Sequence, residues 1–332
     1  MPAATPEVLV EAIIDAVQQC GSAATLISPV RHQPRKFLIT APGGEGYVLW
    51  VYAWTLTFGG RPALGNEWRI QMTSVKSPLA LNPNGPTVLL GYERDLGVFA
   101  GFDIIRHREF TQGSPSVQVD ITPVRQALES GLTFHRKGNG EIAIGIRPDQ
   151  LINYALNAAD LHKSGRRPEI LQLLERAAVL DPIGEKEIRS VPAGRRQIVQ
   201  TVVKLSRSAN FRQQVLHAYG SRCAVTRMQL RLVDAAHILP VGAPGSIDHV
   251  TNGIALSPTY HRAYDNGLIY LDVDHHMRLN AAKLNQLSML ELHGGEDTFK
   301  APLGKIYLPP DKKQWPQPEL IGKANEFRQI SS

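Results

Sequence analysis

The first third of the chain consists of short apolar segments separated by turn-forming residues. Apolar positions recur at helical spacing over residues 5–20, and from about 36 to 120 the segments become short and rich in β-branched and aromatic residues. Gly, Pro or Asn bounds these segments, as is typical of strands. They are KFLITAP, YVLWVYAWTLTF, EWRIQMT, TVLLGYE, LGVFAGFDII and SVQVDI. This pattern predicts a helix followed by a region built mainly from strands.

Helical periodicity dominates the middle of the chain. The pattern predicts helices over 122–131, 147–162 and 169–180, and a basic helix over about 196–219 that ends at the YGSR turn. Between them, the charged segment 183–197 contains Pro192 and Gly194 and is typical of a connector. We therefore predict an α+β chain. Its parts would be a β-rich N-terminal domain with helices over residues 1–182, a linker over 183–197, and a C-terminal domain over 198–332 with a C-terminal extension.

The segment VDAAHILPVGAPGSIDHVTNGIALSPTYHRAYDNGLIYLD gathers polar residues that a core segment does not need. LVDAAHILPV alternates like a strand and places His237 near the strand end. The pair Asn252-Gly253 is a strong hairpin signal, and GIALSP is the expected return strand. A short helix, TYHRAYDNG, then carries His261 and Asp265 four residues apart on one face.

This arrangement suits the hydrolysis of a phosphodiester. A neutral imidazole at His237 can activate a water molecule, while a divalent cation neutralises charge on the phosphate and the leaving oxygen. His261 and Asp265 can hold one cation jointly, and Arg262 beside them can contact a phosphate. The pattern therefore predicts a one-metal nuclease site.

The segment from about 211 to 272 resembles an HNH nuclease domain of the ββα-metal class, and is most similar to the variety found in bacterial restriction endonucleases. The succession AAHI…NG.AL…HR.YD.GL carries this resemblance. It implies that His237 is the general base and that Asn252 holds the loop and orients the base. It also implies that His261 is the last histidine of the motif, and that Asp265 is a second ligand on the helix.

Two departures from the family pattern affect the metal site. Many relatives have a metal-binding Asp or His directly before the base, where this chain has Ala236. Asp234 is the nearest carboxylate, and is either a further metal ligand or a brace that holds the fold through an arginine. Cys223 is followed three residues later by Thr226, so a structural zinc ribbon is not expected.

Charge is distributed unevenly along the chain. Residues 1–160 contain 13 Lys and Arg against 14 Asp and Glu, whereas residues 161–332 contain 23 against 16. A basic C-terminal half suits a polyanion, and double-stranded DNA is the expected partner. The DNA-binding candidates are Arg61, Arg69, Arg106, Arg108, Arg207, Arg212 and Arg262. The first four could instead be surface charges paired with Glu67, Asp103 and Glu109.

Composition adds expectations about the cellular setting. Two cysteines are too few for a disulfide framework, and a reducing cytoplasm is the simplest setting. No apolar run reaches the roughly 20 residues that cross a bilayer, so a membrane partner is not expected. The aromatic residues Trp50, Tyr52, Trp54, Phe58 and Trp68 are either core or a base-stacking surface.

These observations favour a metal-dependent DNA endonuclease of restriction type, either type II or modification-dependent. Ligands without thiolates favour Mg²⁺ or Mn²⁺ over Ni²⁺ or Zn²⁺. One site per chain suggests a homodimer for cutting both strands. One alternative is a catalytically silent DNA-binding sensor with an HNH fold. Another is an antiphage effector nuclease whose N-terminal domain senses a ligand.

Overall fold

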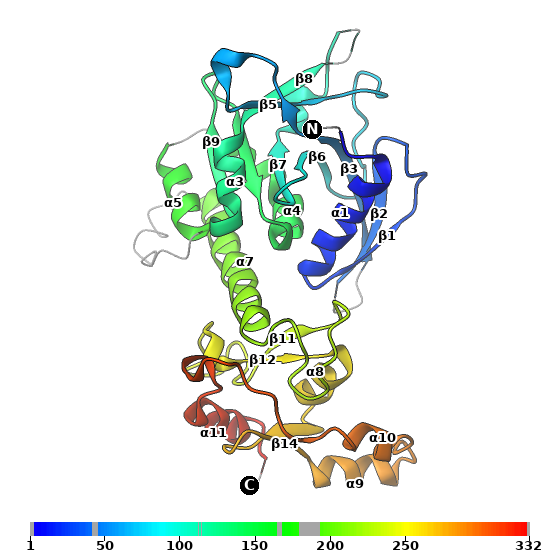
Figure 1. The fold of residues 1–332 in the computed structure, drawn as a ribbon, viewed down its shortest axis with the longest axis vertical. Helices are drawn as coiled ribbons and strands as arrows, with labels where there is room; N and C mark the ends of the chain where they lie inside the picture. Colours follow the sequence, from blue (N-terminus) through cyan, green and yellow to red (C-terminus); the bar gives the residue numbers. More distant parts are fainter. Residues whose placement is uncertain are drawn as a thin grey trace. The chain divides into compact units, whose positions relative to one another are not determined.

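The computed structural model describes residues 3–41, 46–111, 113, 115–164, 168–178 and 193–330 (Figure 1). Contacts divide the chain into two units, Met1–Ala209 and Asn210–Ser332. The division falls inside helix α7 (Ala193–Ala218), later in the chain than the predicted linker. Of that linker, residues 193–197 form the start of α7, and residues 183–192 lie outside the described part.

The first unit contains a seven-stranded mixed sheet in the order β1-β2-β3-β6-β7-β10-β9. Within it, β3 and β6 are parallel and the other neighbours are antiparallel. The strands are β1 (Ala23–Leu26), β2 (Arg35–Thr40), β3 (Gly46–Thr55), β6 (Thr87–Glu93), β7 (Val98–Phe102), β9 (Leu132–Arg136) and β10 (Ile142–Ile146).

Side chains alternate between the two faces of this sheet. One face carries Leu49, Val51 and Ile144 in a core that also contains apolar residues of the helices α1 (Pro6–Gln19), α4 (Leu151–Ser164), α5 (Pro168–Ala178) and α7. The opposite face carries Leu89 and Phe102, and is covered by a second sheet in the order β4-β5-β8 and by helix α3. These elements are β4 (Thr57–Phe58), β5 (Glu67–Gln71), β8 (Ser116–Asp120) and α3 (Ile121–Ser130).

Short-range signals account for several of these boundaries. Helix α1 begins where the Thr5 hydroxyl accepts a hydrogen bond from the Val8 amide, and Pro6 occupies its first turn. Helix α3 begins at Asp120, whose carboxylate accepts from the Thr122 amide, and ends at Gly131 with φ of 81°. The α+β prediction and the β-rich N-terminal region are confirmed.

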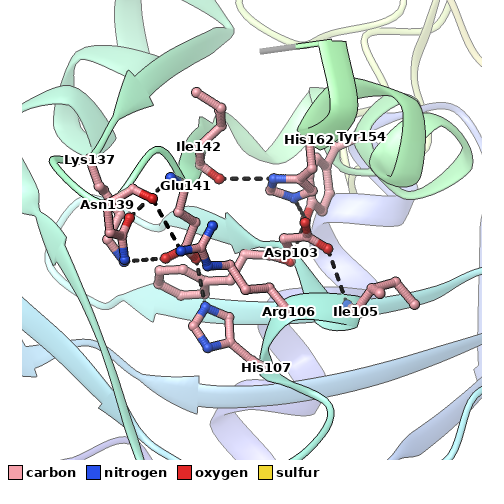
Figure 2. A network of polar contacts seen from close by, with 11 residues as sticks. Asp103, Ile105, Arg106, His107, Lys137, Asn139, Glu141, Ile142, Tyr154 and His162 are labelled. Atoms are coloured by element: carbon pink, nitrogen blue, oxygen red, sulfur yellow. Dashed lines mark hydrogen bonds and ion pairs between the residues drawn. The ribbon is translucent and has the colours of Figure 1, made fainter. Parts of the chain in front are cut away.

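A polar network ties together α2 (Ile104–His107), the β9–β10 hairpin and α4 (Figure 2). The buried Glu141 carboxylate contacts His107 Nε2 at 2.6 Å and accepts from Lys137 Nζ at 2.7 Å. These two partners hold the pKa of Glu141 down at about 2, against the effect of its burial. His162 donates from Nδ1 to the Ile142 carbonyl and accepts at Nε2 from the Tyr154 hydroxyl, at 2.9 Å each.

The second unit contains a two-stranded sheet of β11 (Asp234–His237) and β12 (Gly253–Leu256), with helix α8 (Pro258–Asp265) following in the chain. A second small sheet has the order β13-β14-β15. Its strands are β13 (Ile269–Leu271), β14 (His276–Leu279) and β15 (Gly304–Lys305). The remaining α-helices described are α9 (Ala281–Met289), α10 (Glu296–Lys300) and α11 (Pro318–Phe327). The predicted strand–loop–strand–helix unit is therefore present.

The hairpin expected at Asn252-Gly253 is wrong in detail. Asn252 ends a 3₁₀ turn, η3 (Val250–Asn252), and Gly253 starts β12 with extended φ and ψ of −122° and 147°. The glycine is needed for space, since a Cβ there would lie 3.1 Å from Phe211 Cζ and overlap Val215. Thus Gly253 lets α7 pack directly against β12.

None of the described helices is both long enough and apolar enough to cross a membrane.

Candidate active site

His237 lies at the end of β11, opposite Gly253 of β12. Its imidazole stacks on the Phe211 ring, with centroids 3.7 Å apart and planes 15° from parallel. Its Nε2 lies 3.0 Å from Asp248 Oδ1, in the loop that joins the two strands. Because a carboxylate only accepts, this bond places the proton on Nε2 and leaves the Nδ1 lone pair free.

Burial lowers the pKa of His237, and this effect outweighs the contacts that raise it. Asp248 and Asp265 raise the pKa, while the neighbouring His261 lowers it further. The imidazole is therefore held in its neutral form near neutral pH, which is the form that can accept a proton.

His261 and Asp265 lie one turn apart on α8, with His261 Nε2 3.4 Å from Asp265 Oδ2. On the other edge of the ring, His261 Nδ1 lies 4.0 Å from Asp234 Oδ2. The facing Asp234 carboxylate raises the pKa of His261 despite partial burial. The two carboxylates thus flank one imidazole from opposite sides.

Asp234 also pairs with an arginine. Arg212 Nη2 donates to Asp234 Oδ1 at 3.2 Å and to the Val233 carbonyl at 3.3 Å. Both His261 and Arg212 lower the pKa of Asp234, with His261 the larger influence. Arg212 is therefore the arginine through which Asp234 could brace the fold. Its guanidinium contacts groups of the second unit itself.

Asn252 is fully buried and holds the loop before it. Its Nδ2 donates to the Leu239 and Ile247 carbonyls at 3.1 and 3.0 Å, and its Oδ1 accepts from the Leu239 amide at 2.9 Å. The Ile238 amide donates to the Asn252 carbonyl at 2.8 Å. These bonds fix both ends of the loop that carries Asp248, so Asn252 positions His237 through its neighbours.

No group of three or more His, Cys, Asp or Glu side chains is arranged to hold a metal ion in the part of the chain that the structure describes. The predicted ligands Asp234, His261 and Asp265 are adjacent, but the two carboxylates face different ring nitrogens of His261. With the side chains in these positions, a single ion could therefore be coordinated by His261 and only one of the two carboxylates. Ala236, at the position of the missing family ligand, is wholly buried.

The other arginine candidates are dispersed over the two units. In the first unit, Arg61 pairs with Glu67 at 2.6 Å, Arg106 donates to the Asn139 carbonyl and Arg108 donates to the Leu79 carbonyl. Arg69 is half-buried on β5, and Arg207 is exposed on α7. In the second unit, Arg262 lines a groove of about 650 Å³ formed by α8, α9 and α10.

Two residues of this site escaped the sequence analysis. Asp248 lies in a loop marked only by its glycine and proline residues, and Phe211 belongs to a helix whose pattern indicated only packing. No helix or strand spans the 11 residues from His237 to Asp248, so no periodic pattern relates the two side chains. Only the closed loop brings the two side chains together.

Two protein-family models match parts of this chain. Residues 223–272 match the family model of the HNH endonuclease, and residues 47–155 match the model of methylase-associated X1. A search of curated proteins finds no significant match. Among solved structures, a modification-dependent TagI restriction endonuclease aligns over 84% of this chain and 81% of its own, at 13% identity. The TM-score is 0.31, which does not establish a common fold.

The HNH match covers β11, η3, β12 and α8, which carry His237, Asn252, His261 and Asp265. Residues 223–272 are therefore an HNH endonuclease domain, as their motif predicted.

Proposed function

We propose that this protein is a metal-dependent DNA endonuclease of restriction type, with His237 as its general base. The observation that carries the proposal is the bond from His237 Nε2 to Asp248, which leaves Nδ1 free to take a proton. Burial favours the neutral imidazole, and the HNH family match supports a phosphodiester as the substrate. In this reaction His237 takes a proton from the water that attacks phosphorus, giving 5′-phosphate and 3′-hydroxyl ends.

The donor set suits a divalent cation. An imidazole and carboxylates are ligands that Mg²⁺, Mn²⁺ or Zn²⁺ accepts, and the second unit offers no pair of thiolates, since its one cysteine is the buried Cys223. We assign the ion to His261 Nε2 and Asp265, which lie side by side. Once bound, such an ion would neutralise charge on the scissile phosphate and the leaving oxygen.

Asp234 has a different role in this proposal. It faces His261 Nδ1 and accepts from Arg212, so it orients the imidazole toward Asp265 rather than joining the ligands. Carboxylates behind metal-binding histidines commonly act in this way. Arg262 follows His261 on α8 and would contact a phosphate of the bound strand.

Nicking of supercoiled plasmid with Mg²⁺ or Mn²⁺ tests the proposal. His237→Ala should abolish nicking, while binding of a duplex to the full chain persists. His293→Ala is the matched control, because His293 is exposed and lies outside the segment that matches the HNH model. Cleavage by His237→Ala at the rate of the parent would remove His237 from the role of base.

Cutting both strands would require two copies of this site. Each chain contributes one His237, so we propose a homodimer that places two sites on a two-fold duplex. Sedimentation of the protein with and without a duplex measures this directly. If one chain binds each duplex and the plasmid is nicked rather than linearised, the protein cuts only one strand.

A catalytically silent DNA-binding sensor is the competing function. It is favoured by the buried Ala236 and by the placement of Asp234 and Asp265 on different edges of His261. The sensor predicts duplex binding with no nicking under Mg²⁺, Mn²⁺, Ni²⁺ or Zn²⁺. Nicking with any one of these ions that His237→Ala removes would exclude it.

A further inference from the structure

A long stretch of the chain before the active site contains no acidic residue. From Ile188 to Val233 there is no Asp or Glu, whereas Arg and Lys recur throughout. The last part of this stretch, residues 221–232, connects α7 to β11 and contains Arg222, Arg227 and Arg231. We call residues 221–232 the arginine loop. Its charge is uniformly positive, so it favours an anionic partner.

The base of the arginine loop is anchored in the core. Cys223 and Ala224 are fully buried, and the Ala224 amide donates to the Ala255 carbonyl of β12 at 2.7 Å. The Cys223 amide donates to the Met228 carbonyl at 2.8 Å, and the Arg227 amide donates to the Cys223 carbonyl at 2.9 Å. These bonds close a tight turn at the base of the loop.

The outer part of the loop exposes apolar side chains in an unfavourable backbone conformation. Leu230 is 77% exposed, and Leu232 and Met228 are 51% and 42% exposed. Leu230 and Arg231 have φ of 45° and 54°, in the left-handed region that disfavours side chains with a Cβ. An exposed leucine in this conformation contributes little to the core, and such strain often marks a binding site.

The same loop also exposes its arginines. Arg222 is exposed, and no hydrogen bond or ion pair of its side chain is found among the described residues. Arg227 is also exposed, and its guanidinium lies 4.9 Å from the centre of the Tyr307 ring. A loop that exposes both arginines and a leucine suits the minor groove of duplex DNA, where phosphates border partly apolar sugar and base edges.

We propose that the arginine loop is a second DNA-contact element, in which Arg222 and Arg227 bind phosphates flanking the scissile one and Leu230 enters the minor groove. The loop runs directly into β11, where Asp234 follows Leu232 by two residues and Arg212 holds the intervening Val233. In this proposal, a duplex bound at His237, at the other end of β11, extends as far as the loop. The inference rests on the proposed function, since it assigns a further contact for the same substrate.

The test measures duplex affinity with the full-length His237→Ala chain, in which cleavage is switched off. Fluorescence anisotropy with a labelled duplex of about 30 base pairs gives Kd over a range of NaCl concentrations. Arg222→Gln with Arg227→Gln should weaken binding by roughly tenfold or more, and reduce the slope of log Kd against log salt by about two. Leu230→Ala should weaken binding severalfold and leave the slope unchanged.

Matched variants separate a specific contact from a general effect. Arg278→Gln removes a guanidinium that already pairs with Asp272 at 2.8 Å, and so controls for the loss of positive charge. Met289→Ala truncates a side chain that is 77% exposed, as Leu230 is, and so controls for the loss of an exposed apolar side chain. Neither should change Kd or the slope. The inference would be overturned if the loop variants bound the duplex as tightly as the parent, or if the control variants lost as much affinity as the loop variants. In either case, cleavage by the native chain would leave the proposed function intact.

Two other outcomes would overturn it differently. A change in the sedimentation mass of Leu230→Ala, with unchanged duplex affinity, would make the loop a contact between copies of the chain. If the native chain neither binds nor cuts DNA, the proposed function fails and the loop's role fails with it.

Discussion

His237 Nε2 lies 3.0 Å from Asp248 Oδ1, and this bond decides which ring nitrogen can act as a base. Asp248→Asn would let Nε2 accept from the amide and move the proton to Nδ1. We expect kcat to fall by roughly 10²–10⁴-fold, which is the usual contribution of a general base, with little change in duplex Kd. Single-turnover cleavage measures the rate, and an unchanged rate would show that the Asp248 contact is dispensable.

The pH dependence of cleavage follows from the same pair. Neutral His237 is the active form, and burial lowers its pKa below the usual 6.5. With enough divalent ion to keep His261 unprotonated, whose own pKa is raised, activity should therefore persist on the acidic side of pH 6.5 and decline as the pH falls through the lowered pKa of His237. Since Asp248 raises this pKa, Asp248→Asn should move the acidic limb to still lower pH. An acidic limb above pH 7 in the native chain would contradict the assignment.

Asn252→Ala should destabilise the second unit by about 3 kcal/mol, because it leaves buried loop carbonyls and an amide without partners. Hydrogen exchange should quicken at the Leu239 amide, which now donates to Asn252 Oδ1. Cleavage should lose kcat more than affinity, since the loop also carries Asp248. Urea unfolding with the full chain measures the stability, and Ser246→Ala serves as a milder control in the same loop.

Gly253→Ala tests the packing behind the base. The new methyl group would overlap Val215 and press on Phe211, the ring on which His237 stacks. Overpacking of this kind costs about 1–3 kcal/mol, and it should also displace the imidazole. We expect lower stability together with slower cleavage. Gly267→Ala is a useful comparison, because open space surrounds that glycine and any cost there comes from its φ of 69°.

Glu141→Gln should destabilise the first unit in a pH-dependent way. The pKa of Glu141 is about 2 in the fold, compared with 4.5 for an unperturbed glutamate as in the unfolded chain, so its stabilisation is complete above pH 4.5 and disappears as the pH falls toward 2. The shift corresponds to roughly 3 kcal/mol. Thermal unfolding should therefore separate native and variant chains at pH 7 and bring them together near pH 2. Glu67→Gln, at a partly exposed pair, should show little effect at either pH.

The sequence predicted the parts of this molecule that local pattern controls. Strand β6 agrees with the predicted TVLLGYE segment, and α1 differs from its predicted bounds by one residue at each end. The hairpin β9–β10 was missed because LTFHR and IAIGI lie between two strong helical patterns. Its strands are fixed by pairing with β7 and with each other, which no short window reveals.

The same distinction applies to the site. His261 and Asp265 were predictable as a pair because the helix repeat places them on one face. The contacts of His237 with Asp248 and Phe211 depend on a closed loop and on a glycine that admits a neighbouring helix. Arg212 pairs with Asp234, which its charge alone could not indicate, and its contact with DNA stays a prediction.

The turn at Cys223 has a practical consequence for handling the protein. Many small domains are held together by a zinc ion bound to paired cysteines. Here Cys223 is the one cysteine of the second unit, and backbone hydrogen bonds and a buried apolar core surround it. Stripping the protein with a chelator should therefore remove whatever ion serves the reaction without unfolding the chain. Different ions can then be returned one at a time, and their effects on the chemistry compared in an intact molecule.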